Sequence, residues 1–396
     1  MIYNRTGKFF HLTYKPTHFK SLAEWIPDKD VIYYFHPYDQ SISGIPMLNA
    51  IDDIHWDHLR SEPTAKFLYE NCNETFTFEL ALQIKELITT KEIPASKIFM
   101  IVMDEVHKSF LEDRFKELDI SDVTIGIYNM SLEKTTCYPN RQAFPNERLV
   151  EKKFSALSRN YRAWRLHLYA LLAKTQLLNN FVYSFYNIFP YGTVRHYDKA
   201  TMLADLEATS FGIVDNSVSE WLDHVPYELP NNNVLNKWDD ITYRTIFSAD
   251  FHLLVETHYD FYYVPLDSDN IYHRKLAPSS VTEKGYKPIA CGRPFIAFST
   301  PYFLEQIREL GFETFSPHIN EDYDLELDSK KRLEMIVAEV KRISNLSTNK
   351  YQHLLEQCNE IAKRNKELFI TKQSNKQRNL NFAFMPEHFE VLHIIH

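Results

Sequence analysis

A carboxylate and a cation stand side by side at a helix-start signal in the segment "SSVTEKGYKPIACGRPFIAF". Ser280 and Glu283 match a capping box, in which Ser280 caps the helix and Glu283 reaches back to the amide of the cap. Lys284 then puts a cation in the first turn, where the positive end of the helix makes it unfavourable by roughly 0.3–1 kcal/mol. Gly285 weakens a helix by about 1 kcal/mol relative to Ala, and Pro288 lacks an amide donor. The capping box therefore explains Glu283 but not the residues that follow it.

A ligand-binding turn accounts for the whole set. Lys284 offers a point charge to a phosphate, Gly285 permits close approach of the backbone, and Glu283 can accept hydrogen bonds from two neighbouring ribose hydroxyls. Thr282 and Lys287 lie in the same short segment and belong to the same candidate binding set. Two interpretations of Glu283 stay open, a helix cap and a contact to a nucleotide.

A second cationic helix start lies in "SRNYRAWRLHLYALLAK". Arg159 and Arg162 fall at the start of a predicted helix over 160–179, for which Asn160 is a candidate N-cap. Helix amides and guanidinium groups together suit phosphate, and in open α/β sheets ligands bind just after the carboxyl ends of strands. The alternative is that these arginines are solvated or paired with surface carboxylates.

The elements that position these turns alternate between strand and helix. Apolar runs and amphipathic periodicity in the first half predict strands over 30–35, 97–103 and 122–130, with helices over 76–91 and 105–119. In the second half the predicted strands cover 153–158, 181–186, 249–257 and 293–299, and predicted helices cover 160–179, 300–311, 328–346 and 349–370. Such alternation favours mainly parallel sheets covered on both faces.

The length of 396 residues favours two domains, and the polar, proline-containing stretch 136–153 is typical of a connection between them. We therefore predict an N-terminal Rossmann-like domain over 1–150 and a C-terminal Rossmann-like domain over 151–372, with a cleft between them. A tail over 373–396 can pack back on the N-terminal domain. The predicted fold class is α/β.

Composition limits the possible functions. The content of 44% hydrophobic residues excludes wholesale disorder, and no apolar run is long enough to span a membrane. Four widely spaced cysteines and the absence of a secretory pattern at the N-terminus favour a cytoplasmic protein. The net charge of −9 makes nucleic acid an unexpected partner, although one local basic groove stays compatible with it.

Metal and cofactor motifs are absent from the sequence. The histidines in "HWDH" and "FHLLVETHYD" lack the spacing of a zinc site, so we expect no metal. No Gly-x-Gly-x-x-Gly pattern, P-loop lysine motif or Gly-x-Ser-x-Gly elbow occurs. Nicotinamide dehydrogenases, P-loop kinases and serine hydrolases of these types are therefore not expected, and no tightly bound cofactor is predicted.

Residues within 153–315 resemble the donor-binding region of the family-ten fucosyltransferases and of exostosin-like and virus-encoded glycosyltransferases. The resemblance is carried by "LLVETHYD…SSVTEKGYKPIACGRPFIAFST", in which "VET" includes Glu256, and by "FSALSRNYRAWRLHLYALLAK". It departs from the family at Thr257, which stands where the family has Asn, and in a longer spacer between the two parts of the first motif. Contacts assigned to that Asn are not carried over, and the donor sugar need not be fucose.

The resemblance implies a GT-B fold, in which the C-terminal domain binds a nucleotide sugar, the N-terminal domain binds the acceptor, and a metal is often not needed. On this basis Glu283 would bind ribose. Lys284, together with Arg159 or Arg162, would neutralise the pyrophosphate leaving group. The donor would be a GDP- or UDP-sugar.

The residue eight positions after Glu283 is Cys291, whereas common retaining GT-B enzymes carry a second glutamate there. This difference favours an inverting reaction, in which a base on the N-terminal domain takes the proton of the acceptor hydroxyl. Candidate bases follow predicted strands of that domain, and for each of them a helix cap or an ordinary loop position is the alternative. They are His36, Asp39, Asp104 and Glu105.

Two functions stay open. The first is an inverting hexosyl- or fucosyl-type glycosyltransferase acting on a hydroxyl of a glycan, or on a modified nucleobase if the source is a virus. The second is a non-catalytic protein that holds a saccharide or a partner in an aromatic-rich cleft, since the chain has 24 Tyr and 28 Phe.

Overall fold

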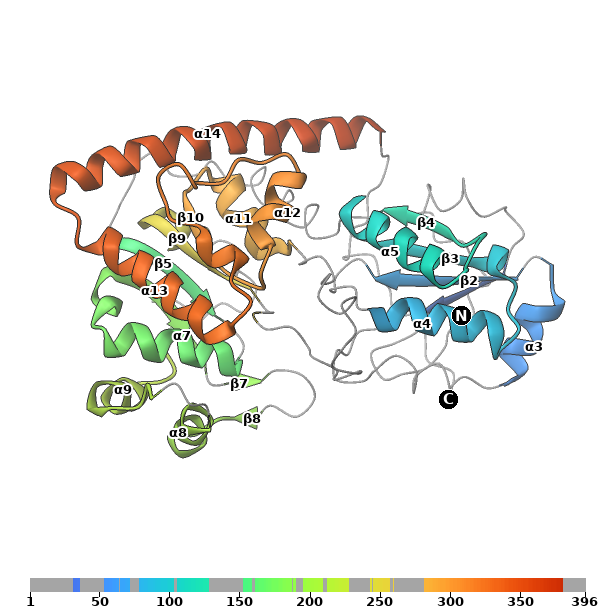
Figure 1. Cartoon of the computed structure of the whole chain (residues 1–396), viewed down its shortest axis with the longest axis horizontal. Helices are drawn as coiled ribbons and strands as arrows, with labels where there is room; N and C mark the ends of the chain where they lie inside the picture. The colour runs from blue at the N-terminus through green and yellow to red at the C-terminus, as the bar shows by residue number, and fades with distance from the viewer. Residues whose placement is uncertain are drawn as a thin grey trace. The chain divides into compact units, whose positions relative to one another are not determined.

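The structure is a computed structural model of the chain. It describes residues 31–35, 53–63, 65–71, 78–102, 105–127, 152–158, 161–186, 188–189, 195–208, 212–227, 243, 245–256, 259 and 281–379. The chain divides into two compact units, residues 1–130 with 371–396 and residues 131–370 (Figure 1). The predicted cut after residue 150 lies outside the described residues, so the assignment of an acceptor domain and a donor domain stays a prediction.

The first unit contains a four-stranded parallel sheet in the order β1-β2-β3-β4. Each strand pairs with the strand that follows it in the chain, so the chain always moves in the same direction across the sheet. Right-handed crossovers therefore place the connecting helices on one face. In agreement, helix α4 (Phe78–Thr89) contacts helix α5 (Glu105–Glu117), and a further helix, α3 (Asp53–Ser61), precedes β2. The strands are β1 (Val31–Phe35), β2 (Ala65–Asn71), β3 (Ile98–Val102) and β4 (Thr124–Ile127).

The second unit contains a four-stranded parallel sheet in the order β10-β9-β5-β6. The chain passes from β5 to β6 on one side and then crosses back to β9 on the other side, so the strand order reverses between β5 and β9. In open α/β sheets such a reversal is the topological switch point, where ligands bind. The strands are β5 (Lys152–Ser158), β6 (Phe181–Phe185), β9 (Ala249–Val255) and β10 (Phe295–Phe298).

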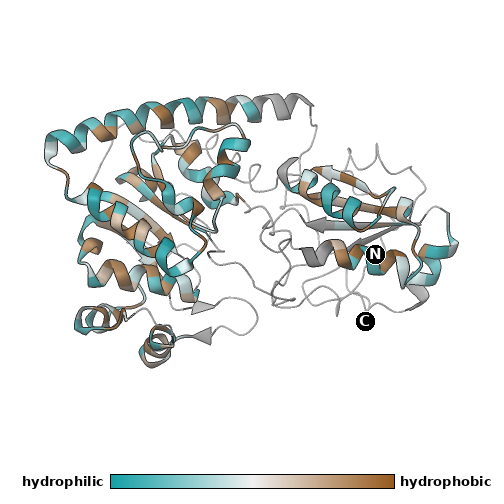
Figure 2. Ribbon diagram, viewed as in Figure 1, coloured by the Kyte–Doolittle hydropathy of each residue, from teal (hydrophilic) through white to brown (hydrophobic). Residues whose placement is uncertain are grey.

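Helices cover the second sheet. All seven residues of β9 are buried, as expected of a parallel strand covered on both faces. Hydrophobic residues gather in β9 and β10 (Figure 2). Hydrophobic and hydrophilic residues alternate along the part of the long helix α14 that is coloured in the same figure. The helices are α7 (Ala163–Lys174), α8 (Lys199–Glu207), α9 (Asn216–Leu222), α11 (Glu283–Cys291), α12 (Phe303–Glu309), α13 (Ser329–Ser344) and α14 (Thr348–Asn379).

The predicted α/β class with two Rossmann-like units is confirmed. A short antiparallel pair, β7 (Ile188–Phe189) with β8 (Arg195–His196), is the exception among the described strands. The sequence did not predict β2 and α3 in the first unit, nor β7, β8, α8 and α9 in the second. The run "AKFLYEN" of β2 carries charges at Lys66 and Glu70 and lacks the continuous apolar character of the strands that were predicted.

Candidate functional site

Two helices of the second unit begin near the switch point. Helix α7 follows β5 after a short connection, and α11 precedes β10 and packs against β9. The last residues of β5 and β9 are Ser158 and Val255, and Glu256 follows β9 directly. Three of the side chains that the sequence marked on the two cationic helix starts therefore belong to one region of one unit, namely Arg162, Glu283 and Lys284.

Glu256 joins the end of β9 to the start of α11. Its side chain is buried, with 3% of the residue exposed. The hydroxyl of Thr282 lies 2.9 Å and 2.8 Å from the two carboxylate oxygens, and the Thr282 amide donates to one of them at 3.3 Å. Thr282 is the N-cap of α11, and its Oγ1 accepts from the amide of Lys284 at 3.3 Å. A buried carboxylate thus holds the helix cap in place.

The capping box that the sequence suggested is wrong. Helix α11 begins at Glu283, so Glu283 occupies the first helical position and cannot reach back as a third-position partner. Thr282 caps the helix in place of the predicted Ser280, which lies outside the described residues. The end of the helix agrees with the prediction, since Gly292 adopts a left-handed conformation with φ of 63°.

Arg165, which was not among the predicted site residues, is a buried guanidinium at the switch point. Its Nε and Nη2 donate to the main-chain carbonyl oxygen of Glu256 at 3.3 Å and 3.0 Å. Burial, together with the charge of Arg162, lowers the pKa of Arg165 to about 10, although Glu256 and Glu283 act in the opposite direction. A bound anion would stabilise the charged form of Arg165 against burial and against the repulsion from Arg162. The signal in the sequence was the spacing of three residues between Arg162 and Arg165, which places both on one side of the helix start.

Arg162 lies at the start of α7 as its N-cap residue, without a side-chain cap. It is partly exposed, and its charge acts on Arg165. The predicted cap, Asn160, lies outside the described residues, and the helix starts three residues later than predicted. The predicted cationic helix start is nevertheless present at Arg162.

Glu283 and Lys284 form an ion pair, with 2.9 Å between Oε1 and Nζ. Their side chains are 36% and 30% exposed, so the pair is open to solvent on one side. Burial raises the pKa of Glu283, but the charges of Lys284 and Lys287 outweigh it and lower the pKa to about 2. Burial lowers the pKa of Lys284, but Glu283 and Glu256 outweigh it and raise the pKa. Both groups are therefore charged at neutral pH.

The charge balance of this region is positive. Among the described residues, four cationic side chains act on one another or on two carboxylates around the starts of α7 and α11. The cations are Arg162, Arg165, Lys284 and Lys287, and the carboxylates are Glu256 and Glu283. We call these six residues the switch-point cluster. An excess of positive charge beside a helix start suits an anion such as a phosphate group.

Gly285 has a different role from the one that the sequence suggested. A Cβ atom at this position would lie 2.8 Å from Val281 Cγ1, 3.3 Å from Phe303 Cζ and 3.7 Å from Glu256 Oε1. The missing side chain therefore lets α11 pack against the protein itself, including α12. The predicted close approach of a ligand at Gly285 is replaced by close approach of Val281 and Phe303.

Several predicted site residues cannot be placed. Arg159, His36, Asp39 and Asp104 lie outside the described residues. Glu105 is the first residue of α5 in the first unit, and its side chain is not described. The predicted catalytic base therefore stays a prediction.

In the described part of the chain, no three His, Cys, Asp or Glu side chains are grouped so that they could hold a metal ion. None of the described helices combines the length and apolar character needed to span a bilayer.

No protein-family model matches the chain, and no curated protein matches it in sequence. Solved structures do show similarity. The chain is similar to a structure from E. coli that is described as trehalose-6-phosphate bound with UDP-2-fluoro glucose. The TM-score is 0.44 at 14% identity, and the match covers 90% of this chain and 75% of that chain. It is also similar to an alpha,alpha-trehalose-phosphate synthase (UDP-forming) from Burkholderia vietnamiensis, with a TM-score of 0.40, 10% identity, and coverage of 88% and 71%.

A third similar structure is a trehalose-6-phosphate synthase studied with bisubstrate glycomimetics for glycosyltransfer with retention. Its TM-score is 0.42 at 12% identity, and the match covers 91% of this chain and 76% of that chain. These values are too low for a shared activity, donor or stereochemistry to follow from them. The fucosyltransferase resemblance of the sequence is not confirmed by these structures.

Proposed function

We propose that the chain is a glycosyltransferase of the GT-B type that binds a nucleotide-diphosphate sugar at the switch-point cluster. The observation that carries this proposal is the grouping of Arg162, Arg165 and Lys284 with Glu283 beside the carboxyl ends of β5 and β9. This is the location at which open α/β sheets bind nucleotides. The donor is proposed to be a UDP- or GDP-sugar.

Each residue of the cluster has a proposed part in donor binding. The guanidinium groups of Arg162 and Arg165 contact the pyrophosphate, because they are the cations whose mutual repulsion an anion would relieve. Lys284 leaves Glu283 to contact the same pyrophosphate. Glu283 is then free to accept hydrogen bonds from two ribose hydroxyls. When the donor replaces the Lys284–Glu283 ion pair, Lys284 contacts the pyrophosphate and Glu283 accepts from the ribose hydroxyls. Both side chains therefore keep a polar partner.

Glu256 and Thr282 are proposed to position the donor site. The Glu256 carboxylate is engaged by Thr282, and its carbonyl oxygen is engaged by Arg165. It therefore fixes α7 and α11 against each other at the end of β9. Lys287 lies one turn further along α11 and adds positive charge near Glu283.

The proposed reaction is inverting. A base on the N-terminal domain removes the proton of the acceptor hydroxyl, the oxygen attacks the anomeric carbon, and the bond from that carbon to the phosphate oxygen breaks. The electron pair stays on the nucleoside diphosphate, where the cations of the cluster stabilise it. Candidate bases remain His36, Asp39, Asp104 and Glu105.

Cys291 supports inversion. It stands where a retaining enzyme of the common type has a second glutamate, and it is 4% exposed at the end of α11. Burial raises the pKa of its thiol to about 12, so it stays neutral and cannot replace a carboxylate. The proposed acceptor is a hydroxyl of a glycan, with a modified nucleobase as the second acceptor class.

The test is a transfer assay with UDP- and GDP-sugars of glucose, galactose, mannose and fucose and a panel of glycan acceptors. We expect release of nucleoside diphosphate with wild type, and its loss in Lys284→Ala while the circular dichroism spectrum and the melting temperature are retained. Lys363→Ala, an exposed lysine on α14, is the matched control and should keep full activity. NMR of the first product formed reports the anomeric configuration, and a retained configuration would refute inversion. Nucleotide binding without turnover would favour a non-catalytic saccharide-binding protein instead.

A further inference from the structure

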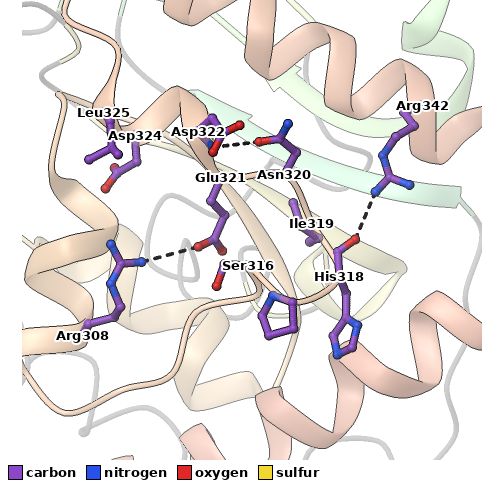
Figure 3. Close-up of a pocket in the computed structure, with 11 residues that line it drawn as sticks. Arg308, Ser316, His318, Ile319, Asn320, Glu321, Asp322, Asp324, Leu325 and Arg342 are labelled. Carbon is purple, nitrogen blue, oxygen red and sulfur yellow. Dashed lines mark hydrogen bonds and ion pairs between the residues drawn. The ribbon is translucent and has the colours of Figure 1, made fainter.

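A pocket of about 610 Å³ lies in the second unit between α12 and α13 (Figure 3), and none of the six residues of the switch-point cluster lines it. Its walls come from the end of α12, from residues 316–325 and from α13. Arg308 and Arg342 stand on opposite sides of it in Figure 3, with Glu321 between them. Its volume falls within the range of roughly 300–1,000 Å³ that is usual for small-molecule sites.

Two of the three acidic side chains of the pocket, Glu321 and Asp324, are already engaged by the protein. The carboxylate of Asp324 accepts from the amides of Leu304 and Glu305 at 2.9 Å and 3.2 Å, which caps α12. Glu321 accepts from the amide of Phe315 at 2.6 Å, and Arg308 lies 3.5 Å from its other oxygen. These buried carboxylates hold the walls of the pocket in place.

The arginines are compensated in the same way. Arg342 forms two short contacts to Glu339, at 2.8 Å and 2.6 Å, and donates to the main-chain oxygen of His318 at 3.2 Å. Arg308 also donates to Thr314 at 3.0 Å. Both arginine side chains are still 43% exposed, so each has donor groups that solvent or a ligand can reach.

This arrangement disfavours a charged ligand of either sign. An anion would face the carboxylates of Asp322 and Asp324, and a cation would face Arg308 and Arg342. A hydroxyl group, by contrast, donates to a carboxylate and accepts from a guanidinium. Ser316 and Asn320 add further donors and acceptors to the walls.

The pocket also has an apolar surface. Leu325 lines it and is 60% exposed, one of the most exposed large hydrophobic side chains in the described part of the chain. Pro317 is exposed on the same wall segment. A ligand that carries hydroxyls on its edges and C–H groups on its faces would use both parts of this surface.

We propose that this pocket is a binding site for a neutral saccharide, separate from the proposed donor site. Hydroxyls of the sugar bind the carboxylates and guanidinium groups, and its C–H face packs on Leu325. The proposal rests on the pocket alone and holds whether or not the chain transfers sugars.

Ligand-observed saturation-transfer NMR on the full chain tests the proposal, with glucose, galactose, mannose, fucose and N-acetylglucosamine as probes. We expect at least one of these sugars to give a signal that persists when UDP and GDP are present in excess. Leu325→Ser and Asp322→Ala should each reduce the signal at least two-fold. Their matched controls are Leu327→Ser, at a leucine 49% exposed outside the pocket walls, and Glu334→Ala on α13.

Four outcomes would overturn the proposal, and the last of them concerns charged probes. The first is no signal from any of the five sugars, and the second is a signal that both pocket variants leave unchanged. The third is a signal that UDP or GDP abolishes, because the sugar would then occupy the donor site. Spermidine and inorganic phosphate serve as charged probes, and binding of either at this pocket more tightly than every sugar would also contradict a neutral ligand.

Discussion

The hydroxyl of Thr282 contacts both carboxylate oxygens of Glu256, at 2.9 Å and 2.8 Å, and so fastens the cap of α11 to the end of β9. Because Arg165 donates to the carbonyl oxygen of the same glutamate, one residue connects both helices of the proposed donor site. The site is thus built on regular elements whose positions are fixed by buried polar contacts.

Removal of the Thr282 hydroxyl should destabilise the second unit. Thr282→Val keeps the shape of the side chain but loses the cap and leaves Glu256 with less hydrogen bonding in a buried place. We expect a loss of about 1–3 kcal/mol in the free energy of unfolding, measured in urea. Thr282→Ser keeps the hydroxyl and should lose less than half as much. Equal stability of Thr282→Val and wild type would contradict this role.

Gly285→Ala should also destabilise the fold, although Ala favours helices by about 1 kcal/mol. The added Cβ would lie 2.8 Å from Val281 Cγ1, and overpacking of this kind costs roughly 1–3 kcal/mol. Val281→Ala in the same chain should recover part of the loss, which a double-mutant cycle measures. A more stable Gly285→Ala variant would show that this contact is easily relieved.

The carboxyl group of Glu321 should make stability depend on pH. Burial raises its pKa to about 7, and the charge of Asp324 adds to this rise. Hydrogen bonds from Thr314 and the Phe315 amide and the charge of Arg308 act in the opposite direction. The folded state therefore holds this proton between about pH 4.5 and 7, where the unfolded state has lost it. The contribution of Glu321 is fully present below pH 4.5 and is lost as the pH rises through 7.

Glu321→Gln removes this titration. The stability of wild type minus that of Glu321→Gln should fall between pH 5 and pH 7.5 in urea unfolding. A difference that is constant or rises with pH would contradict the assignment.

Arg165 should be needed for nucleotide binding. Arg165→Lys keeps the charge but cannot make two hydrogen bonds to the Glu256 carbonyl oxygen in the same geometry. We expect at least a ten-fold weaker nucleotide affinity by calorimetry. Arg364→Lys, at an exposed ion pair on α14, is the control and should bind as wild type does. Unchanged affinity in Arg165→Lys would remove this residue from the site.

Local patterns predicted the elements of the site well. The apolar run at 249–257 is read directly from neighbouring residues, and β9 confirms it. A helix was also predicted close to its observed place, but with its cap at Ser280 instead of Thr282. The contact between Glu256 and Thr282 spans 26 residues, so no local pattern could reveal it. Arg165 was missed because its neighbours on α7 are apolar, and an arginine on such a helix is usually assumed to reach solvent.

The structure changes the interpretation of the neighbouring residues Glu283 and Lys284. The sequence offered a cap and a ligand contact as alternatives for Glu283, and the structure gives the cap to Thr282. Glu283 is thereby left with an ion pair that a ligand can replace. This difference depends on where the helix begins, which sequence patterns locate only to within a few residues.

Thermal unfolding with added nucleotides tests the central claim most directly. A nucleoside diphosphate that binds the folded chain at 100 times its dissociation constant stabilises it by about 2.7 kcal/mol. We predict a rise in the melting temperature with UDP or GDP for wild type and Lys363→Ala, and no rise for Lys284→Ala. The absence of any shift with UDP, GDP, ADP or CDP in wild type, or an undiminished shift in Lys284→Ala, would contradict donor binding at the switch-point cluster.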